Sequence, residues 1–166
     1  MNTPLKVSGQ SKRLRMIGIL TLITLALDLA SKQWARTSLD TEMHSYLGNF
    51  FVLEHSENTG AFLSLGAALS PQFRFWIFTV LIAIITFGVL FYIIKTKVLP
   101  DVQTAAYTLI VAGGFGNLVD RVMKESVTDF MNVGIGSLRT GIFNVADMAI
   151  MAGVFILMFL SFKKES

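Results

Sequence analysis

Four apolar stretches dominate the chain and alternate with more polar segments. Residues 75–94 are uncharged over 20 positions and residues 102–119 over 18, and a helix needs about 20 residues to cross the hydrocarbon of a membrane. The outer two stretches are shorter, with 12 residues before Asp28 and 15 after Asp147. They reach spanning length only if each aspartate lies inside its helix. We therefore predict membrane spans over about 14–34, 73–94, 102–121 and 144–162.

The polar segments between the spans predict a small amount of β-structure. Residues 46–54 are rich in aromatic and β-branched side chains, which favours a short strand on the membrane surface. A turn signal at 58–60 precedes a small apolar run over 61–69, which predicts a short interfacial helix, and Pro71 precedes the second span. Residues 122–143 contain Gly134, Gly136 and Gly141, and we predict that they form an irregular or β-rich segment. The predicted fold class is an all-α membrane protein, a single domain over 1–166, with four transmembrane helices and a small β-containing extracytoplasmic segment.

Charge gives this topology an orientation, because lysine and arginine collect on the cytoplasmic side of membrane proteins. The two terminal flanks and the connection 95–101 together hold 8 basic residues against 2 acids, whereas the other side holds 6 basic residues against 9 acids. We therefore expect the N and C termini in the cytoplasm. The first span is expected to be an uncleaved helix rather than a signal peptide, because it contains Asp28 and lacks a clear cleavage site.

Composition excludes several classes of chemistry. The chain is 53% hydrophobic, only 15% charged and free of cysteine, which excludes thiol catalysis, disulfides and thiolate metal sites. His44 and His55 are its two histidines, and they stand in no metal-binding pattern. The sequence has no phosphate-binding loop and no basic patch with interleaved aromatic residues. We therefore expect no cofactor, no metal and no nucleic acid partner.

Acidic residues gather at one end of the predicted bundle. Asp28, Asp120 and Asp147 lie at the outward ends of three spans, and Asp129 lies in the segment before the last span. An acid at mid-membrane costs roughly 2.5–3.5 kcal/mol on insertion scales and less near the interface. Several acids at one depth therefore indicate a function.

Asp129 and Asp147 are candidates for paired catalysis. They stand 18 residues apart, and the chain between them must return to the membrane surface. Two adjacent carboxyls share one proton, so the charged one can accept a proton from water while the neutral one donates to a carbonyl. The structural alternative is that each aspartate caps a helix or pairs with Arg121 or Arg139.

Other polar side chains share helix faces at the same end, because they stand three or four positions apart. Asn144 precedes Asp147 by three residues and is expected to be an N-cap. Asp28 and Lys32 are expected to form an ion pair. A further group forms either a polar seam between helices or part of a site: Asn117, Asp120 and Arg121.

Four short motifs occur in a fixed order along these spans. The segments are Asp28–Lys32, Asn58–Phe62, Gly113–Arg121 followed by Val127–Phe130, and Phe143–Asp147. Together they resemble lipoprotein signal peptidase (signal peptidase II), a bacterial membrane aspartic peptidase, over about 14–162. Each motif is weak alone, but four in this order on four spans are specific. The chain departs from the family pattern at Leu29 and Met148, and at 139–142, which lacks an often-found proline.

The resemblance implies an aspartic endopeptidase that cleaves diacylglyceryl-modified prolipoproteins just before the lipidated cysteine. Asp129 and Asp147 would be the catalytic pair, near the outer leaflet of the bacterial cytoplasmic (inner) membrane. Globomycin-type cyclic peptides would bind the same site, membrane lipid is a further expected partner, and we expect a monomer. The residues implied for substrate binding or support are Asn58, Gly60, Asn117, Arg121, Asn144, Asp28, Lys32 and Asp120.

Two functions from other classes are compatible with the residues alone. A small proton or cation transporter would use the acids as a path, and it predicts acids spread through the depth of the membrane. A non-enzymatic assembly factor would tolerate the loss of both Asp129 and Asp147.

Overall fold

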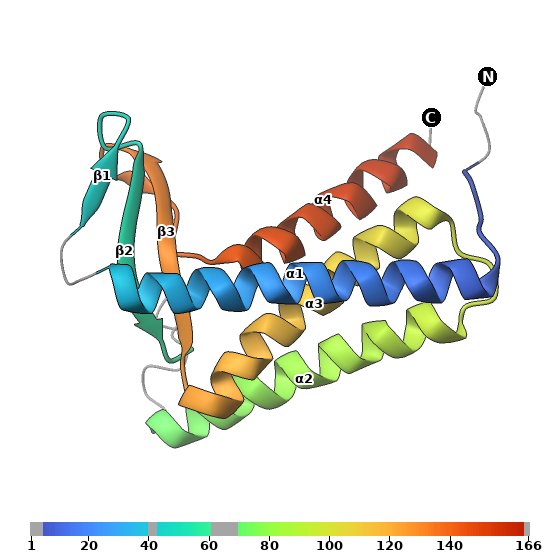
Figure 1. Cartoon of the computed structure of the whole chain (residues 1–166), viewed down its shortest axis with the longest axis horizontal. Helices are drawn as coiled ribbons and strands as arrows, with labels where there is room; N and C mark the ends of the chain where they lie inside the picture. Colours follow the sequence, from blue (N-terminus) through green and yellow to red (C-terminus); the bar gives the residue numbers. More distant parts are fainter. Residues whose placement is uncertain (1–4, 40–42, 61–69, 165–166) are drawn as a thin grey trace.

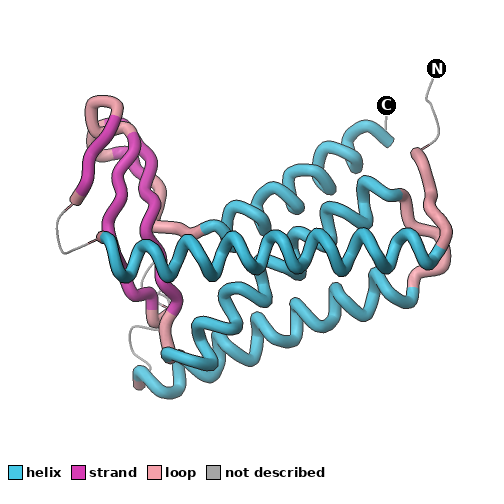
Figure 2. The backbone as a smooth tube through the Cα atoms, viewed as in Figure 1, coloured by secondary structure: helices cyan, strands magenta, loops and turns pink. Residues whose placement is uncertain are grey.

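Four long helices and a four-stranded sheet form the part of the chain that this computed structural model describes, residues 5–39, 43–60 and 70–164. The helices are α1 (Gln10–Ser38), α2 (Pro71–Lys95), α3 (Asp101–Lys124) and α4 (Val145–Lys164). The strands are β1 (His44–Tyr46), β2 (Phe51–Asn58), β3 (Val127–Ile135) and β4 (Leu138–Arg139). Figures 1 and 2 show the helices running lengthwise, with the sheet set across one end of the bundle.

All four helices are long and apolar enough to cross a membrane. The predicted spans agree with α1 to α4 to within four residues at each end, which confirms the four predicted transmembrane helices. The helices continue slightly beyond the apolar residues, since helical hydrogen bonding persists into the polar flanks. Pro71 begins α2 as predicted, and Ser70 caps this helix by accepting a hydrogen bond from the Phe73 backbone N–H at 3.3 Å.

Helix α3 lies at the centre of the bundle. Half of its most apolar window is buried inside the protein, compared with 11–17% for the other three helices. Small residues let transmembrane helices approach closely, and three glycines of α3 each meet a different neighbour. A side chain at any of them would overlap that neighbour. The pairs are Gly113 with Ala146 of α4, Gly114 with Thr86 of α2, and Gly116 with Asp28 of α1.

The sheet is antiparallel in the order β1-β2-β3-β4, so the β-structure predicted in both connecting segments is confirmed. The single strand predicted over 46–54 is divided into two. Leu47, Gly48 and Asn49 all have positive φ, of 52°, 64° and 72°, and this left-handed run turns the chain between β1 and β2. The short helix predicted over 61–69 lies outside the described residues.

Two pairings bring β2, β3 and the start of α4 together. The Met131 N–H donates to the Phe143 carbonyl at 2.9 Å, and the Phe143 N–H donates back to the Met131 carbonyl at 2.8 Å. A register shift between Leu53 and Ser56 changes the pairing of β2 with β3. Ser56 then stands opposite Asp129. The residue on β3 that carries a carboxyl therefore lies beside the turn that begins α4.

A small apolar core joins the sheet to the helices. Trp34 at the end of α1 packs edge-on against Phe130 of β3, with 6.2 Å between the ring centroids. The buried members of this core are Ala35, Leu39 and Phe130, with Leu53, Met131 and Val145 packed against them. The core fixes the sheet on the end of the bundle.

Candidate active site

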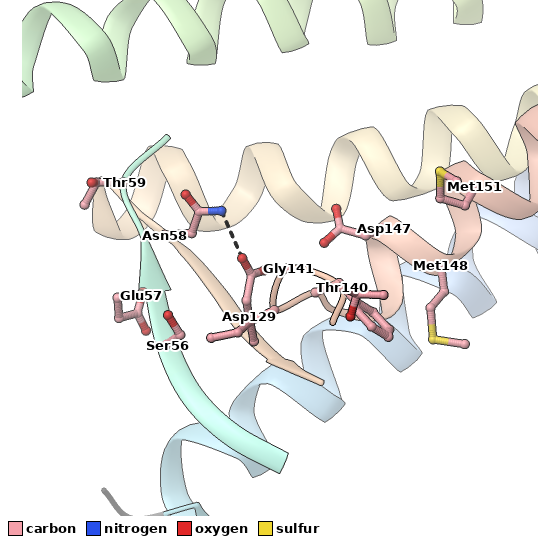
Figure 3. Close-up of a pocket in the computed structure, with 12 residues that line it drawn as sticks. Ser56, Glu57, Asn58, Thr59, Asp129, Thr140, Gly141, Asp147, Met148 and Met151 are labelled. Carbon is pink, nitrogen blue, oxygen red and sulfur yellow. Dashed lines mark hydrogen bonds between the residues drawn. The ribbon is translucent and has the colours of Figure 1, made fainter. Parts of the chain in front are cut away.

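A cavity of about 950 Å³ lies where the sheet meets α4. Both Asp129 and Asp147 line it, and Figure 3 shows their side chains at this cavity, one from β3 and one from the first turn of α4. Its walls come from β2, from β3, from the segment before α4 and from α4 itself. The remaining lining residues are Ser56, Glu57, Asn58, Thr59, Thr140, Gly141, Ile142, Phe143, Met148 and Met151.

Asp147 is held by the N-terminus of α4. The Asn144 backbone N–H donates to Asp147 Oδ2 at 3.1 Å, and the Asp147 N–H donates to Asn144 Oδ1 at 2.9 Å. This reciprocal pair is a capping box, which confirms Asn144 as the N-cap. The other carboxyl oxygen, Oδ1, accepts a hydrogen bond from Asn117 Nδ2 at 2.8 Å. Both oxygens of Asp147 are therefore positioned by donors.

Asp129 is buried, with 3% of its surface exposed. Its Oδ2 accepts a hydrogen bond from Asn58 Nδ2 at 3.0 Å, drawn in Figure 3, and its Oδ1 accepts one from Asn144 Nδ2 at 2.7 Å. Burial raises the pKa of Asp129 to about 6; the Asn58 hydrogen bond opposes this shift, and the negative charge of Asp147 adds to it. This carboxyl therefore keeps a proton at higher pH than an ordinary aspartate.

Asn144 connects the two carboxyls. Its side-chain Nδ2 contacts Asp129, while its Oδ1 accepts from the Asp147 backbone. The same Nδ2 lies 3.1 Å from Asn117 Oδ1, and Asn117 in turn donates to Asp147. The two aspartates are thus linked through the amide side chains of Asn144 and Asn117.

Lys32 of α1 holds the Asn117 amide in place. It is fully buried, and its ammonium contacts three acceptors: Asn117 Oδ1 at 3.1 Å, Asp28 at 2.8 Å and Asp120 at 3.3 Å. The predicted ion pair between Asp28 and Lys32 is confirmed. Asp28 also accepts a hydrogen bond from the Ala146 N–H at 2.8 Å, which ties the start of α4 to α1.

Asp120 braces the beginning of β3. It pairs with Arg36 at 2.8 Å and Lys32 at 3.3 Å, and its Oδ2 accepts a hydrogen bond from the Thr128 N–H at 3.1 Å. Asn117 and Asp120 share the helix face that meets Lys32, as predicted. Thr128 directly precedes Asp129, so this contact helps to fix the backbone that carries the buried carboxyl.

Arg121 follows Asn117 by one turn of α3, and its guanidinium lies close to Gly60. Only 6% of Arg121 is exposed, and its Nε and Nη1 have no hydrogen-bond partner within the described chain. Both Asp129 and Asp147 are within electrostatic reach of its guanidinium. Gly60 has a φ of 99°, and an added Cβ would lie 2.9 Å from Phe78 and 3.4 Å from Arg121 Nη1. Only glycine fits at this close approach.

Sequence reasoning missed a second polar cluster at the cavity wall. Glu57 accepts hydrogen bonds from Ser126 and, at 2.9 Å, from Thr128 Oγ1, and His55 Nε2 lies 3.0 Å from its carboxylate. Burial raises the pKa of Glu57, but the hydrogen bonds from Ser126, His55 and Thr128 outweigh it, and the pKa is lowered overall. Alternation along β2 is the signal that could have found this cluster, because His55 and Glu57 share one face of the strand.

The structural alternatives for the aspartates are partly realised. Asp147 does take part in a helix cap, but the cap leaves it at the cavity. Among the described residues, neither Arg121 nor Arg139 forms an ion pair with Asp129 or Asp147. Over ranges 5–39, 43–60 and 70–164, no group of three or more His, Cys, Asp or Glu side chains is arranged to hold a metal ion.

Comparisons with known proteins give a consistent family. Residues 20–163 match the family model described as Signal peptidase (SPase) II. The lipoprotein signal peptidase of Psychromonas ingrahamii is 39% identical over 145 residues, which cover 86% of this chain and 82% of that protein. The protein of the same name from Francisella tularensis subsp. novicida is 32% identical over 150 residues, covering 89% of this chain and 93% of that one.

Solved structures share the fold. Two structures, each titled as a bacterial membrane enzyme, superpose with TM-scores of 0.78 and 0.74 at 22% and 24% identity. The first superposition covers 99% of this chain and 95% of the solved chain. The second covers 87% of this chain and 90% of the solved chain. At these identities the likeness shows the fold alone. Because the family model spans most of the chain and curated relatives exceed 30% identity over most of their length, this membrane protein belongs to the signal peptidase II family of peptidases.

Proposed function

We propose that this chain removes the signal peptide from diacylglyceryl-modified prolipoproteins, cleaving just before the lipidated cysteine, with Asp129 and Asp147 as the catalytic pair. The observation that carries this proposal is the convergence of the two carboxyls on one cavity, with Asn144 joining them. The names of the relatives support the substrate class.

The surroundings of the two carboxyls favour different roles. Asp147 lies in the first turn of α4, where the helix dipole stabilises a negative charge, and both its oxygens accept hydrogen bonds. Asp129 is buried within β3 and its pKa is raised to about 6. We assign the ionised state, and the part of general base, to Asp147. Asp129 carries the shared proton and is the general acid.

The reaction then proceeds in two balanced steps. A water molecule between the carboxyls gives a proton to Asp147 while its oxygen attacks the scissile carbonyl carbon, and Asp129 donates its proton to the carbonyl oxygen. The resulting gem-diol collapses when Asp147 passes its proton to the departing amide nitrogen. Asp129 recovers a proton from a diol hydroxyl. One water is consumed, one peptide bond is broken, and both acids return to their starting states.

The neighbouring residues divide into two groups by what they contact. Asn58, Asn117 and Asn144 donate to the carboxyls and orient them. The Arg121 guanidinium has donors that no described residue uses, so we assign to it the binding of substrate backbone carbonyls. The Gly60 N–H donates to Asn58 Oδ1 at 2.9 Å, so Gly60 supports the site by holding Asn58 and by leaving room for the guanidinium. Lys32, with its two aspartates at the bundle end, braces the site without touching the substrate.

The depth of the site suits a lipid-anchored substrate. Asp147 stands at the end of a helix long and apolar enough to span the membrane. Met148 and Met151 of the same helix line the cavity, and their exposed fractions are 52% and 50%. A diacylglyceryl chain held in the bilayer would keep the scissile bond at this level and bring it in by lateral diffusion. With the charge bias of the flanks, we assign the site to the outer leaflet of the bacterial cytoplasmic membrane.

Cleavage by purified protein tests the proposal directly. A synthetic prolipoprotein peptide bearing the diacylglyceryl cysteine should be cut once, immediately before that cysteine. The matched peptide with an unmodified cysteine should be cut far more slowly. Mass spectrometry of the products gives the position of the cut. Cleavage elsewhere, or equal rates on both peptides, would contradict the assigned specificity.

Two additions to the same assay address the mechanism. Globomycin should inhibit, because a cyclic peptide that occupies the cavity excludes the substrate. EDTA should have no effect, and inhibition by EDTA that a divalent metal reverses would mean that the carboxyls act as metal ligands.

The transporter alternative has its own test. It predicts acids along the membrane depth, but Asp28, Asp120, Asp129 and Asp147 are joined in one network where the sheet meets the bundle. Proton or cation flux into vesicles that contain the purified protein would favour transport, and we expect none above that of empty vesicles.

A further inference from the structure

Five large apolar side chains stand exposed at the ends of the two hairpins of the sheet, outside the cavity. Their exposed fractions are 50% for Tyr46, 81% for Leu47, 44% for Phe50, 76% for Ile135 and 83% for Leu138. We refer to residues 46–50 and 135–138 as the hairpin tips. Large apolar side chains gathered on one surface mark a site that something covers.

The backbone holds these side chains outward. Leu47 has a φ of 52°, a left-handed conformation that is unfavourable for leucine. Gly136, with a φ of 56°, turns β3 into β4 and leaves Ile135 and Leu138 directly opposite each other on one face. Strain that serves to display an apolar side chain indicates a contact made by that side chain.

The two tips form one surface. The Gly134 N–H donates to the Phe50 carbonyl at 2.9 Å, and Arg139 Nη1 donates to the Asn49 carbonyl at 2.8 Å. These bonds tie the β1–β2 turn to the β3–β4 turn. The residues nearest the tips, 45–53 and 130–138, contain no Asp, Glu, Lys or Arg, and the charged residues of these strands lie farther along them or, for Arg139, bind the turn. A surface that is mostly apolar and fixed in shape suits the boundary between headgroups and hydrocarbon, where the one arginine beside it can reach the headgroups.

The depth of the sheet in the membrane points to lipid as the occupant. The chain has two tryptophans. Trp34 lies near the end of α1 and Trp76 near the start of α2, both at the sheet end of the bundle, and they are 45% and 61% exposed. Exposed tryptophan marks the boundary between headgroups and hydrocarbon. Since Trp34 packs against Phe130, β3 lies at that boundary.

The tips also reach past the helices. Figure 1 shows the strands running across the direction of the helices, with the β1–β2 turn and the end of β3 standing clear of the bundle. What surrounds the bundle at this depth is the bilayer, because all four helices span it. We propose that the hairpin tips insert into the headgroup–acyl boundary of the leaflet at the sheet end and anchor the sheet on the membrane.

Spin labelling tests the anchor cleanly, because the chain has no cysteine of its own. Leu138→Cys carries a nitroxide in purified protein, reconstituted in vesicles of phosphatidylcholine and phosphatidylglycerol. Oxygen, which concentrates in lipid, and a water-soluble nickel chelate compete as relaxation agents. Ile84→Cys on α2, where Ile84 is 65% exposed on a membrane span, is the lipid reference. Lys97→Cys, exposed in the α2–α3 connection, is the aqueous reference.

The anchor predicts an oxygen-to-nickel ratio at Leu138→Cys severalfold above that at Lys97→Cys and below that at Ile84→Cys, because residue 84 lies near the middle of a membrane span. Leu47→Cys, in the other tip, should give the same result. A ratio equal to that of the aqueous reference overturns the proposal. Poor access to both reagents also overturns it, because it means that protein, in this preparation a second copy of the chain, covers the tips. None of these outcomes depends on catalysis.

Discussion

Lys32 has no contact with solvent, and its three ammonium protons match the three acceptors around it. One of those acceptors is Asn117 Oδ1, so the amide of Asn117 is fixed with its nitrogen toward Asp147. A cation on α1 therefore determines how a carboxyl on α4 is presented to the cavity. Removing that cation would leave buried Asp28 and Asp120 with less compensation.

The two candidate catalytic acids could be predicted at the residue scale, but most of their partners could not. The spacing of Asp129 and Asp147 and the motifs around them are local properties of the chain. The contact between Lys32 and Asn117 depends on how α1 packs on α3. For the same reason the approach of Arg121 to Gly60 could not be predicted, because it depends on how the chain after β2 meets α3.

The raised pKa of Asp129 predicts the pH dependence of cleavage. A carboxyl with a pKa of about 6 is protonated below that pH and ionised above it. The general acid is therefore lost as pH rises, and kcat/KM, which reports the free enzyme, should fall as pH rises through about 6. Initial rates at low concentrations of the lipidated peptide, measured across the pH range, give this profile.

A control tests whether the predicted fall in kcat/KM comes from the titration of Asp129. The charge of Asp147 helps to raise the pKa of Asp129, so Asp147→Asn should shift the titration of Asp129 to lower pH. NMR of the protein with ¹³C-labelled aspartate follows that titration without any need for activity. An unchanged midpoint in this variant would show that the two carboxyls do not sense each other.

At the scale of elements, helix positions could be predicted because length and apolar composition are local, whereas the division of the strand over 46–54 could not. That division arises from the left-handed backbone of Leu47, Gly48 and Asn49, and leucine rarely adopts it. The register shift in β2 between Leu53 and Ser56 depends on pairing with β3, a segment about 70 residues away.

The close approach of α1 to α3 predicts the effect of one methyl group. Gly116→Ala would place a Cβ against Asp28 Oδ2 and 3.2 Å from the Ala146 Cβ. Asp28 would have to move, and its hydrogen bond to the Ala146 N–H would weaken. Overpacking of this kind costs about 1–3 kcal/mol. The expected result is a lower thermal transition of the purified protein in detergent.

Gly18→Ala on α1 is the matched control, because an added Cβ there meets nothing within 4 Å. Its helix propensity should leave stability unchanged or raise it by up to about 1 kcal/mol. Equal transitions for the two variants would show that the space at Gly116 is not needed.

At the scale of the whole molecule, the apolar helices establish a multi-pass membrane protein, and the direction of insertion follows from charge alone. We predict that an impermeant maleimide added to intact cells labels His55→Cys, on β2, and not Lys97→Cys, in the α2–α3 connection. Both positions are exposed, and no native cysteine competes. Permeabilised cells provide the control, since both variants should then react. Labelling of Lys97→Cys alone in intact cells would reverse the topology.

The proposed catalysis requires the joint action of two carboxyls from different elements. Single-turnover cleavage of the lipidated peptide by the wild type, Asp129→Asn and Asp147→Asn measures it most directly. Each substitution keeps the shape of the side chain and removes one of the two proton-transfer groups, which should lower the rate by at least about 10²-fold. The thermal transition should stay near that of the wild type. Near-normal turnover by either variant would contradict the assignment.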